Sequence, residues 1–378
     1  MSDPYILYGS YASYYTAKVR SYLRKKAIPF VERLPSDPMF RNKVRPYSGS
    51  HRIPQLLAPD GTVIQDSVEI VDYLETRFPH LPAFPDSPRQ RVFVHLMELL
   101  GSEGLVRLAW MHRWLFEAND SFVKMDFGRS FRPQGSDEEL RRYGELIADR
   151  MKSYGLPEAT SEARRALDEQ YCQLLRLFEA HLVEHPYFLG GQPSAADYAV
   201  MGAMHAHLGR DPAGLRIMQD NAPRTFRWVE HMLVPEVQSP EFFSRSVEYL
   251  PDDEVPSTSL AILQFVGSTF GQPFILDTLA FNQAMEVLDP ELGFELAPAD
   301  DQPLLPTEIV KYGGGYQEHK AQLHAVWIGQ RARAWFHALP PDIQLFVSDW
   351  LGDGELRELV QIPMQFELRR VNNRLTIA

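Results

Sequence analysis

The order of short strands and helices in the first eighty residues is the feature that most restricts the fold. Residues 5–8 are a short apolar run rich in strand formers, and they end at a Gly-Ser pair where the chain can turn. Residues 14–26 contain no Gly or Pro and carry apolar side chains with helical spacing. Residues 28–31 return to an extended pattern. Two strands joined through a helix need a crossover connection, so we expect a parallel pair.

The next fifty residues extend this pattern. Residues 52–57 and 62–64 are short apolar runs separated by a Pro-Asp-Gly turn signal, which predicts a hairpin. Apolar residues then recur on one helical face between 70 and 78, and Ser67 suits the N-cap of that helix. Residues 1–80 are therefore expected to form one α/β domain.

The remainder of the chain is predicted to be mainly helical. A proline-rich linker at 81–88 precedes a long helical pattern, so residues 89–248 are expected to form an all-α domain. Residues 249–378 form an extension in which we expect helices at about 260–287 and 317–339.

Two short features of the extension also allow an expectation. Alternating apolar residues on both sides of Asn372-Asn373 suggest a terminal β-hairpin. The glycine run 313–315 follows no expected strand, which favours a loop over a phosphate-binding turn.

Charge and cysteine content exclude several classes of function. The chain has 38 Lys and Arg against 50 Asp and Glu, a formal net charge of −12, which argues against a nucleic-acid partner. No run of eighteen apolar residues and no export signal is present, so we expect no membrane partner. The single cysteine, Cys172, fits a cytoplasmic protein. The histidines lack partners at metal-binding spacing, so no metal is expected.

Several short motifs resemble those of cytosolic glutathione S-transferases. In the first domain they are residues 7–10, 13–16, 18–20, 53–54 and 65–67. In the helical domain, Ser194 and Asp197 match the family's Ser-x-x-Asp motif, which reads as a capping box. The resemblance covers roughly residues 5–235 and implies a thioredoxin-like N-terminal domain, a helical C-terminal domain, a homodimer and glutathione as co-substrate. It also implies that Pro54 follows a cis peptide bond.

The resemblance assigns a set of residues to glutathione. The main chain of Ile53, presented by Pro54, would pair with the cysteinyl unit as an added strand does. Asp66, preceded by Gln65, would take the γ-glutamyl ammonium, and Ser67 with the helix that it opens would take the adjacent carboxylate. The glycyl carboxylate needs a cation, for which Arg52 is the candidate; the alternative is a solvated arginine.

Ser13 is the candidate catalytic residue. It stands just before the first helix, where a hydroxyl donor and the positive end of a helix together favour a thiolate. The position matches that of the catalytic serine in theta-, zeta- and tau-like transferases. Its alternative role is that of a helix N-cap, and Tyr8 is a second candidate donor unless it only packs in its strand.

Large side chains suggest where an electrophile would bind. Trp110, Met111 and Trp114, with Tyr11 from the first domain, are the candidates for a hydrophobic pocket between the domains. Such a stripe at helical spacing also fits a plain core.

The resulting expectation is an enzyme that conjugates glutathione to a hydrophobic electrophile, with the thiolate stabilised by Ser13. One alternative is a transferase-fold protein that serves as a binding or assembly module without catalysis. The other is a glutathione-dependent isomerase or lyase, which would regenerate free glutathione at each turnover.

Overall fold

The computed structural model describes residues 3–154, 156, 160–296, 305, 307–312 and 315–378. Its first part alternates strands and helices in this order: β1 (Tyr5–Tyr8), α1 (Tyr14–Lys25), β2 (Phe30–Arg33), η1 (Phe40–Val44), α2 (Arg45–Ser48), β3 (Gln55–Leu57), β4 (Val63–Gln65) and α3 (Ser67–Glu75). The four strands form one mixed sheet in the order β2-β1-β3-β4. β1 and β2 are parallel, as the crossover predicts, while β1, β3 and β4 pair antiparallel.

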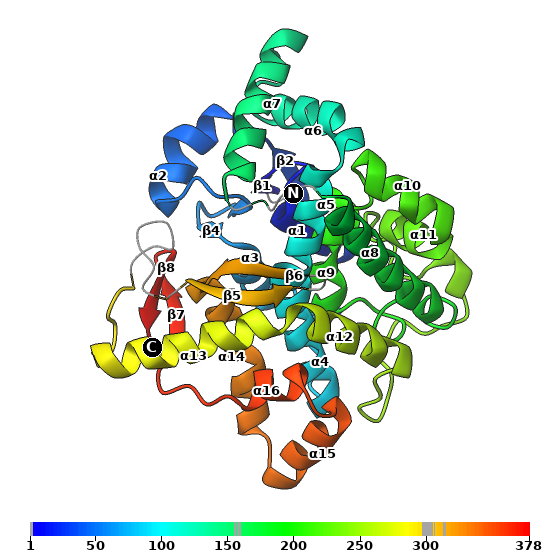
Figure 1. Ribbon diagram of the computed structural model, residues 1–378, viewed down its shortest axis with the longest axis vertical. Coiled ribbons are helices and arrows are strands. Elements are labelled where there is room, and N and C mark those ends of the chain that lie inside the picture. Colours follow the sequence, from blue (N-terminus) through cyan, green and yellow to red (C-terminus); the bar gives the residue numbers. More distant parts are fainter. Residues whose placement is uncertain (1–2, 155, 157–159, 297–304, 306, 313–314) are drawn as a thin grey trace.

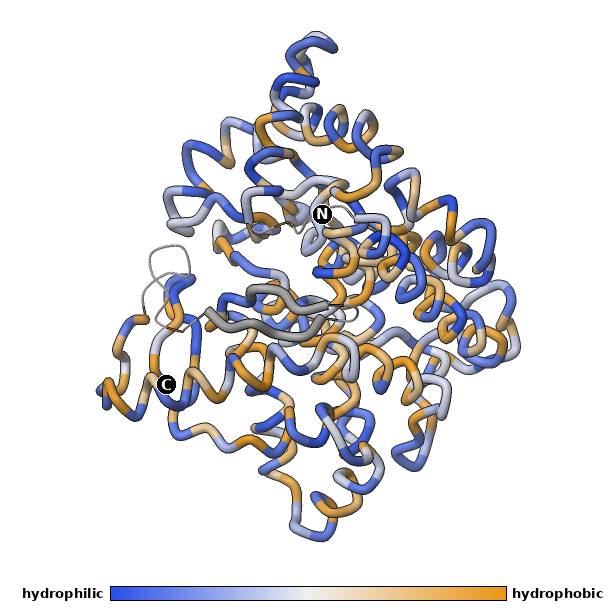
Figure 2. The backbone as a smooth tube through the Cα atoms, in the orientation of Figure 1, coloured by the Kyte–Doolittle hydropathy of each residue, from blue (hydrophilic) through white to orange (hydrophobic). Residues whose placement is uncertain are grey.

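The regular elements of the second part are all helices in the residues that the structure describes. Its elements are α4 (Pro88–Leu99), η2 (Leu100–Gly104), α5 (Leu105–Leu115), α6 (Glu117–Phe131), α7 (Asp137–Lys152), α8 (Ser161–His181), α9 (Ala195–Met201), η3 (Gly202–His207), α10 (Pro212–Asn221), α11 (Pro223–His231) and η4 (Pro240–Phe242). The capping box is confirmed at α9, where the backbone N–H and the hydroxyl of Ser194 both donate to Asp197 Oδ2, at 2.8 Å and 2.9 Å. Hydrophilic residues mark the outer face of this part, most visibly along α7 at the top of Figure 2.

The C-terminal extension, coloured yellow to red in Figure 1, adds helices and two hairpins in the lower half of the picture, beside α3 and α4. Its elements are α12 (Ser257–Phe270), α13 (Gln272–Leu288), β5 (Thr307–Tyr312), β6 (Gly315–Lys320), α14 (Leu323–Ala338), α15 (Pro341–Leu351), α16 (Glu355–Gln361), β7 (Leu368–Val371) and β8 (Arg374–Ile377). The terminal hairpin is confirmed, with positive φ angles of 50° at Asn372 and 64° at Asn373 in its turn.

The helical structure expected over 260–287 is confirmed, and it consists of two helices that meet at Gly271. Two other expectations for the extension are wrong. The helix expected from 317 begins at Leu323, because residues 315–320 pair as β6 with β5. Consequently Gly315 does follow a strand and opens β6; Gly313 and Gly314 lie outside the described residues.

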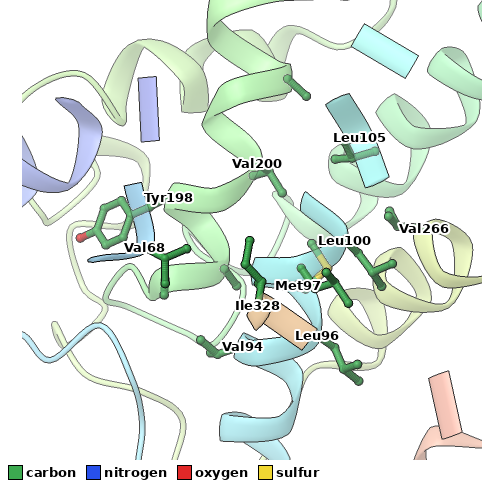
Figure 3. Packing of buried hydrophobic residues seen from close by; sticks show 14 of the residues in the cluster. Val68, Val94, Leu96, Met97, Leu100, Leu105, Tyr198, Val200, Val266 and Ile328 are labelled. Carbon is green, nitrogen blue, oxygen red and sulfur yellow. The ribbon is translucent and has the colours of Figure 1, made fainter. Parts of the chain in front are cut away.

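One hydrophobic cluster runs through all three expected parts of the chain. Figure 3 shows Val68 of α3, Met97 of α4 and Val266 of α12 around the same centre as Ile328 of α14. Ile328 is 1% exposed, so α14 belongs to the core and is not a loosely attached tail. The expected domain limits, 1–80, 89–248 and 249–378, stay a prediction.

Candidate functional site

Ser13 caps helix α1 and keeps its own proton available. Its Oγ accepts a hydrogen bond from the Thr16 backbone N–H at 3.3 Å and another from the Thr16 hydroxyl at 2.8 Å. Within the described part of the chain, the bonds of this hydroxyl are both accepted ones. An oxygen that accepts two bonds becomes a better donor through its own O–H. The cap and the donor are therefore compatible roles for one residue.

The first turn of α1 is fixed by tyrosines. The Tyr14 hydroxyl donates to the Gly101 carbonyl oxygen at 2.6 Å, and the ring lies so close to Gly202 that an added Cβ there would stand 2.3 Å from it. The Tyr15 hydroxyl donates to Glu103 Oε2 at 3.1 Å. These contacts hold the start of α1, and with it Ser13, against the helical domain.

The two segments assigned to glutathione lie side by side at the end of the sheet. Gln55 pairs with Gln65 across β3 and β4, and the Asp66 N–H donates to the Pro54 carbonyl oxygen at 3.4 Å. The Ile53–Pro54 peptide bond is cis, as the resemblance implies.

Asp66, and not Ser67, is the N-cap of α3, so that expectation is corrected. Asp66 has φ 93° and its Oδ1 accepts the Val68 N–H at 2.8 Å, which satisfies one of the free donors of the first turn. Ser67 is the first helical residue and is 3% exposed. The side chain that caps the first turn of α3 is therefore that of Asp66.

Two cations from the C-terminal extension bind the other oxygen of Asp66. His324 Nε2 lies 2.9 Å from Oδ2, and Arg370 Nη1 lies 3.1 Å from it. Burial alone would raise the pKa of Asp66, but His324 and Arg370 hold it well below its usual range. The same carboxylate and Glu103 raise the pKa of His324 above its ordinary value, although burial alone would lower it.

These cations link the two ends of the candidate site. His324 Nδ1 lies 3.6 Å from Glu103 Oε1, so His324 stands between Glu103, which binds Tyr15, and Asp66. Arg370 also donates to Gln65 Oε1 through Nη2. The sequence does not single out His324, Arg370 or Glu103, because their partners are distant along the chain and no local pattern indicates them. His324, for example, is 258 residues from Asp66.

The remaining candidate residues have separate environments. Arg52 is exposed at the start of the hairpin, where its N–H donates to Ser50 Oγ at 3.1 Å. Tyr8 is fully buried, and its ring centroid lies 5.2 Å from that of Phe40 in η1. Burial raises the pKa of the Tyr8 phenol.

The proposed pocket residues differ in exposure. Tyr11 is 49% exposed and Trp110 is half-buried, whereas Met111 is 5% exposed within the main core. Trp114 is half-buried and stacks on Phe127 with ring centroids 5.9 Å apart.

The described ranges also bear on metal sites and membrane-spanning helices. Among the residues that the structure describes, no group of three His, Cys, Asp or Glu side chains is arranged to hold a metal ion. Within the same residues, no single helix is long and apolar enough to cross a membrane; only α12 and α13 taken together pass that test, and they meet at 61°.

Comparison with known proteins gives two family matches. The family described as glutathione S-transferase, N-terminal domain, matches residues 7–90, and the one described as glutathione S-transferase, C-terminal domain, matches residues 146–234. A search of the curated proteins finds no match.

Similar solved structures include several glutathione transferases. One from Methylobacterium radiotolerans, in complex with glutathione sulfonate, is 20% identical and covers 66% of this chain and 96% of its own, with a TM-score of 0.36. Another from Ceriporiopsis subvermispora, in complex with glutathione, is 18% identical over 61% of this chain and 99% of its own, at 0.44. A third from Phanerochaete chrysosporium is 17% identical over 62% and 98%, at 0.46.

The two family matches fall on the mixed sheet with its helices and on the helical part, in the order that the transferase fold requires. Both lie before the extension, which neither match covers. The chain is a member of the glutathione S-transferase family, with an additional C-terminal extension.

Proposed function

We propose that this protein is an enzyme that conjugates glutathione to a hydrophobic electrophile, with Ser13 stabilising the thiolate. The observation that carries the proposal is the hydroxyl of Ser13, which accepts two bonds from Thr16 at the N-terminus of α1. Its proton is thereby directed away from Thr16, and the positive end of the helix dipole adds to the stabilisation of an anion.

The proposed peptide site is the paired edge around the cis Pro54. Ile53 offers main-chain groups to the cysteinyl unit, while Gln65, Asp66 and Ser67 face the γ-glutamyl end and Arg52 the glycyl carboxylate. The backbone bond between Asp66 and Pro54 supports this arrangement, because it holds the two halves of the site at one edge.

The electrophile is proposed to lie near Tyr11, Trp110 and Trp114, with Met111 as part of the wall behind them. The partial exposure of the three rings supports this placement. A homodimer, which the family resemblance implies, and a cytoplasmic location, which the single cysteine favours, are part of the same proposal.

The test is a paired measurement on Ser13→Ala. We expect turnover on a general electrophile to fall about a hundredfold, the usual cost of removing one preorganised donor to a developing anion. The pKa of the bound thiol, followed by thiolate absorbance, is expected to rise. Loss of the cap adds about 1 kcal/mol of destabilisation.

Ser136→Ala is the matched control. Ser136 caps α7 and accepts the Glu139 N–H at 3.3 Å, the same distance as the cap bond of Ser13. Both variants should lower the melting temperature, but only Ser13→Ala should alter turnover and thiol pKa. Equal loss of stability with unchanged chemistry would reduce Ser13 to a cap, and Tyr8→Phe would then be the next variant.

One observation favours a second candidate, a binding or assembly module without catalysis. The carboxylate of Asp66 already binds His324 and Arg370. Absence of any heat on titration with millimolar glutathione, for the native chain and for variants that free Asp66, would favour this second function.

A further inference from the structure

Both oxygens of the Asp66 carboxylate already bind partners within the chain. Its Oδ1 accepts the Val68 N–H, and its Oδ2 is shared by His324 and Arg370. The side chain of Asp66 is 12% exposed and that of Arg370 is 7% exposed. An incoming ammonium would therefore add a third positive charge to an oxygen that two cations already share, and like charges at this range repel.

His324 is held at this position by the packing of its helix. α14 places Ile328 in the main core, one turn after His324. Further along the helix, Arg331 Nη2 lies 2.8 Å from Asp72 Oδ1 on α3, and Arg331 Nη1 lies 3.3 Å from Glu98 Oε2 on α4. The start of α14 is thus fixed between the first two parts of the chain.

Arg370 comes from a different element, the terminal hairpin. Gln330 on α14 holds this hairpin, since its side chain both donates to the Leu368 carbonyl oxygen and accepts the Leu368 N–H. At the other end, Asn373 Nδ2 donates to the Ser48 carbonyl oxygen at 3.1 Å. The guanidinium of Arg370 lies 5.4 Å from the centroid of the Trp327 ring, a cation–π distance. Two linked elements, α14 and the terminal hairpin, therefore each bring one cation to the carboxylate of Asp66.

We propose that the C-terminal extension inhibits the glutathione site of its own chain, with Arg370 and His324 taking the place of the γ-glutamyl ammonium at Asp66. The inference rests on the proposed function and deepens it, because it names what regulates that site. In this conformation glutathione binds without a contact between its ammonium and Asp66. Release of Arg370 from Asp66 opens the site.

The test compares glutathione binding by the native chain, by Arg370→Met and by the double variant Arg370→Met/His324→Asn. Methionine keeps much of the apolar stem of arginine against Trp327 and removes the charge. We expect calorimetric titration to show about tenfold to a hundredfold tighter binding for the variants, the range of one charged hydrogen bond regained.

The adjacent Arg369 supplies a matched control. It lies in the same strand, β7, and is exposed, so Arg369→Met makes the same substitution without touching Asp66. Its affinity should equal that of the native chain. N-acetylglutathione, which lacks the ammonium, is the control ligand: the substitutions at Arg370 and His324 should not improve its binding.

The possible results separate the two proposals. Equal, measurable affinity for glutathione in all variants would overturn self-inhibition and leave the proposed function intact. Weaker binding in Arg370→Met would also overturn it, since the cations would then belong to the site. Absence of binding in the native chain and in the double variant, with unchanged melting temperatures, would reject both.

Discussion

Glu98→Gln is expected to destabilise the protein by about 3 kcal/mol at neutral pH. Glu98 lies on α4 and is fully buried, with Lys18 Nζ at 2.8 Å from Oε1 and Arg331 Nη1 at 3.3 Å from Oε2. Burial alone would raise the pKa of Glu98, but Arg331 and Lys18 lower it to about 2. The difference from the ordinary value of 4.5 corresponds to about 3 kcal/mol. Breaking a buried ion pair typically costs a similar amount.

The pH dependence gives this prediction a sign. Because the pKa of Glu98 is lower in the folded chain, its ionised form contributes fully above pH 4.5 and the contribution is lost as the pH falls toward 2. The native chain and Glu98→Gln should therefore differ most near pH 7 and converge on acidification.

The assay is thermal unfolding at pH 7 and at about pH 3. With an unfolding entropy of roughly 2.1 cal/mol/K per residue, a loss of 3 kcal/mol lowers Tm by about 4 °C if the chain unfolds as one unit. Glu169→Gln, at an exposed position in the middle of α8, makes the same change and should leave Tm within about 1 °C. A Tm for Glu98→Gln that matches this control, or a difference from native that widens in acid, would refute the reasoning.

Two further predictions follow from other contacts. The pKa of His324, measured by NMR titration, should lie above its ordinary value; Asp66→Asn should lower this pKa, and Arg369→Met should leave it unchanged. Because the pKa of His324 is raised in the folded chain, the stability that the His324–Asp66 pair contributes is present below pH 6.5 and is lost as the pH rises through the folded pKa. Gly144→Ala should lower Tm by several degrees, because an added Cβ would stand 2.0 Å from the Lys124 carbonyl oxygen where α6 and α7 meet. Arg141→Ala, on the exposed face of α7, should leave Tm unchanged. Equal Tm values for the two variants would show that α6 and α7 can move apart without loss of stability.

The first domain was predictable because its signals are local. The apolar periods of residues 5–8 and 14–26 indicate a strand and a helix whatever follows, and a crossover between strands then requires the parallel pair of β1 and β2. The capping box at Ser194 and the Asn372-Asn373 turn were found for the same reason, since each is satisfied within a few residues.

The extension shows where local signals fail. Residues 317–320 were expected to be helical, but they belong to β6 and pair with β5, and a strand in an isolated hairpin depends on its partner more than on its own pattern. The break at Gly271 was likewise missed, because the apolar run on both sides of it fits one long helix as well as two.

The sequence by itself determined the element order of the first domain, because hydrophobic period, turn residues and helix caps act over a few residues. The expectation for Pro54 and Asp66 came from the resemblance to the transferase family. Only the tertiary structure decided which charges Asp66 binds. His324 and Arg370 reach it because α14 packs against α4, α13 and α16 and because Gln330 ties the terminal hairpin to that helix. Pairing of charges across 258 residues of chain is set by the packing of whole elements, and no local pattern encodes it.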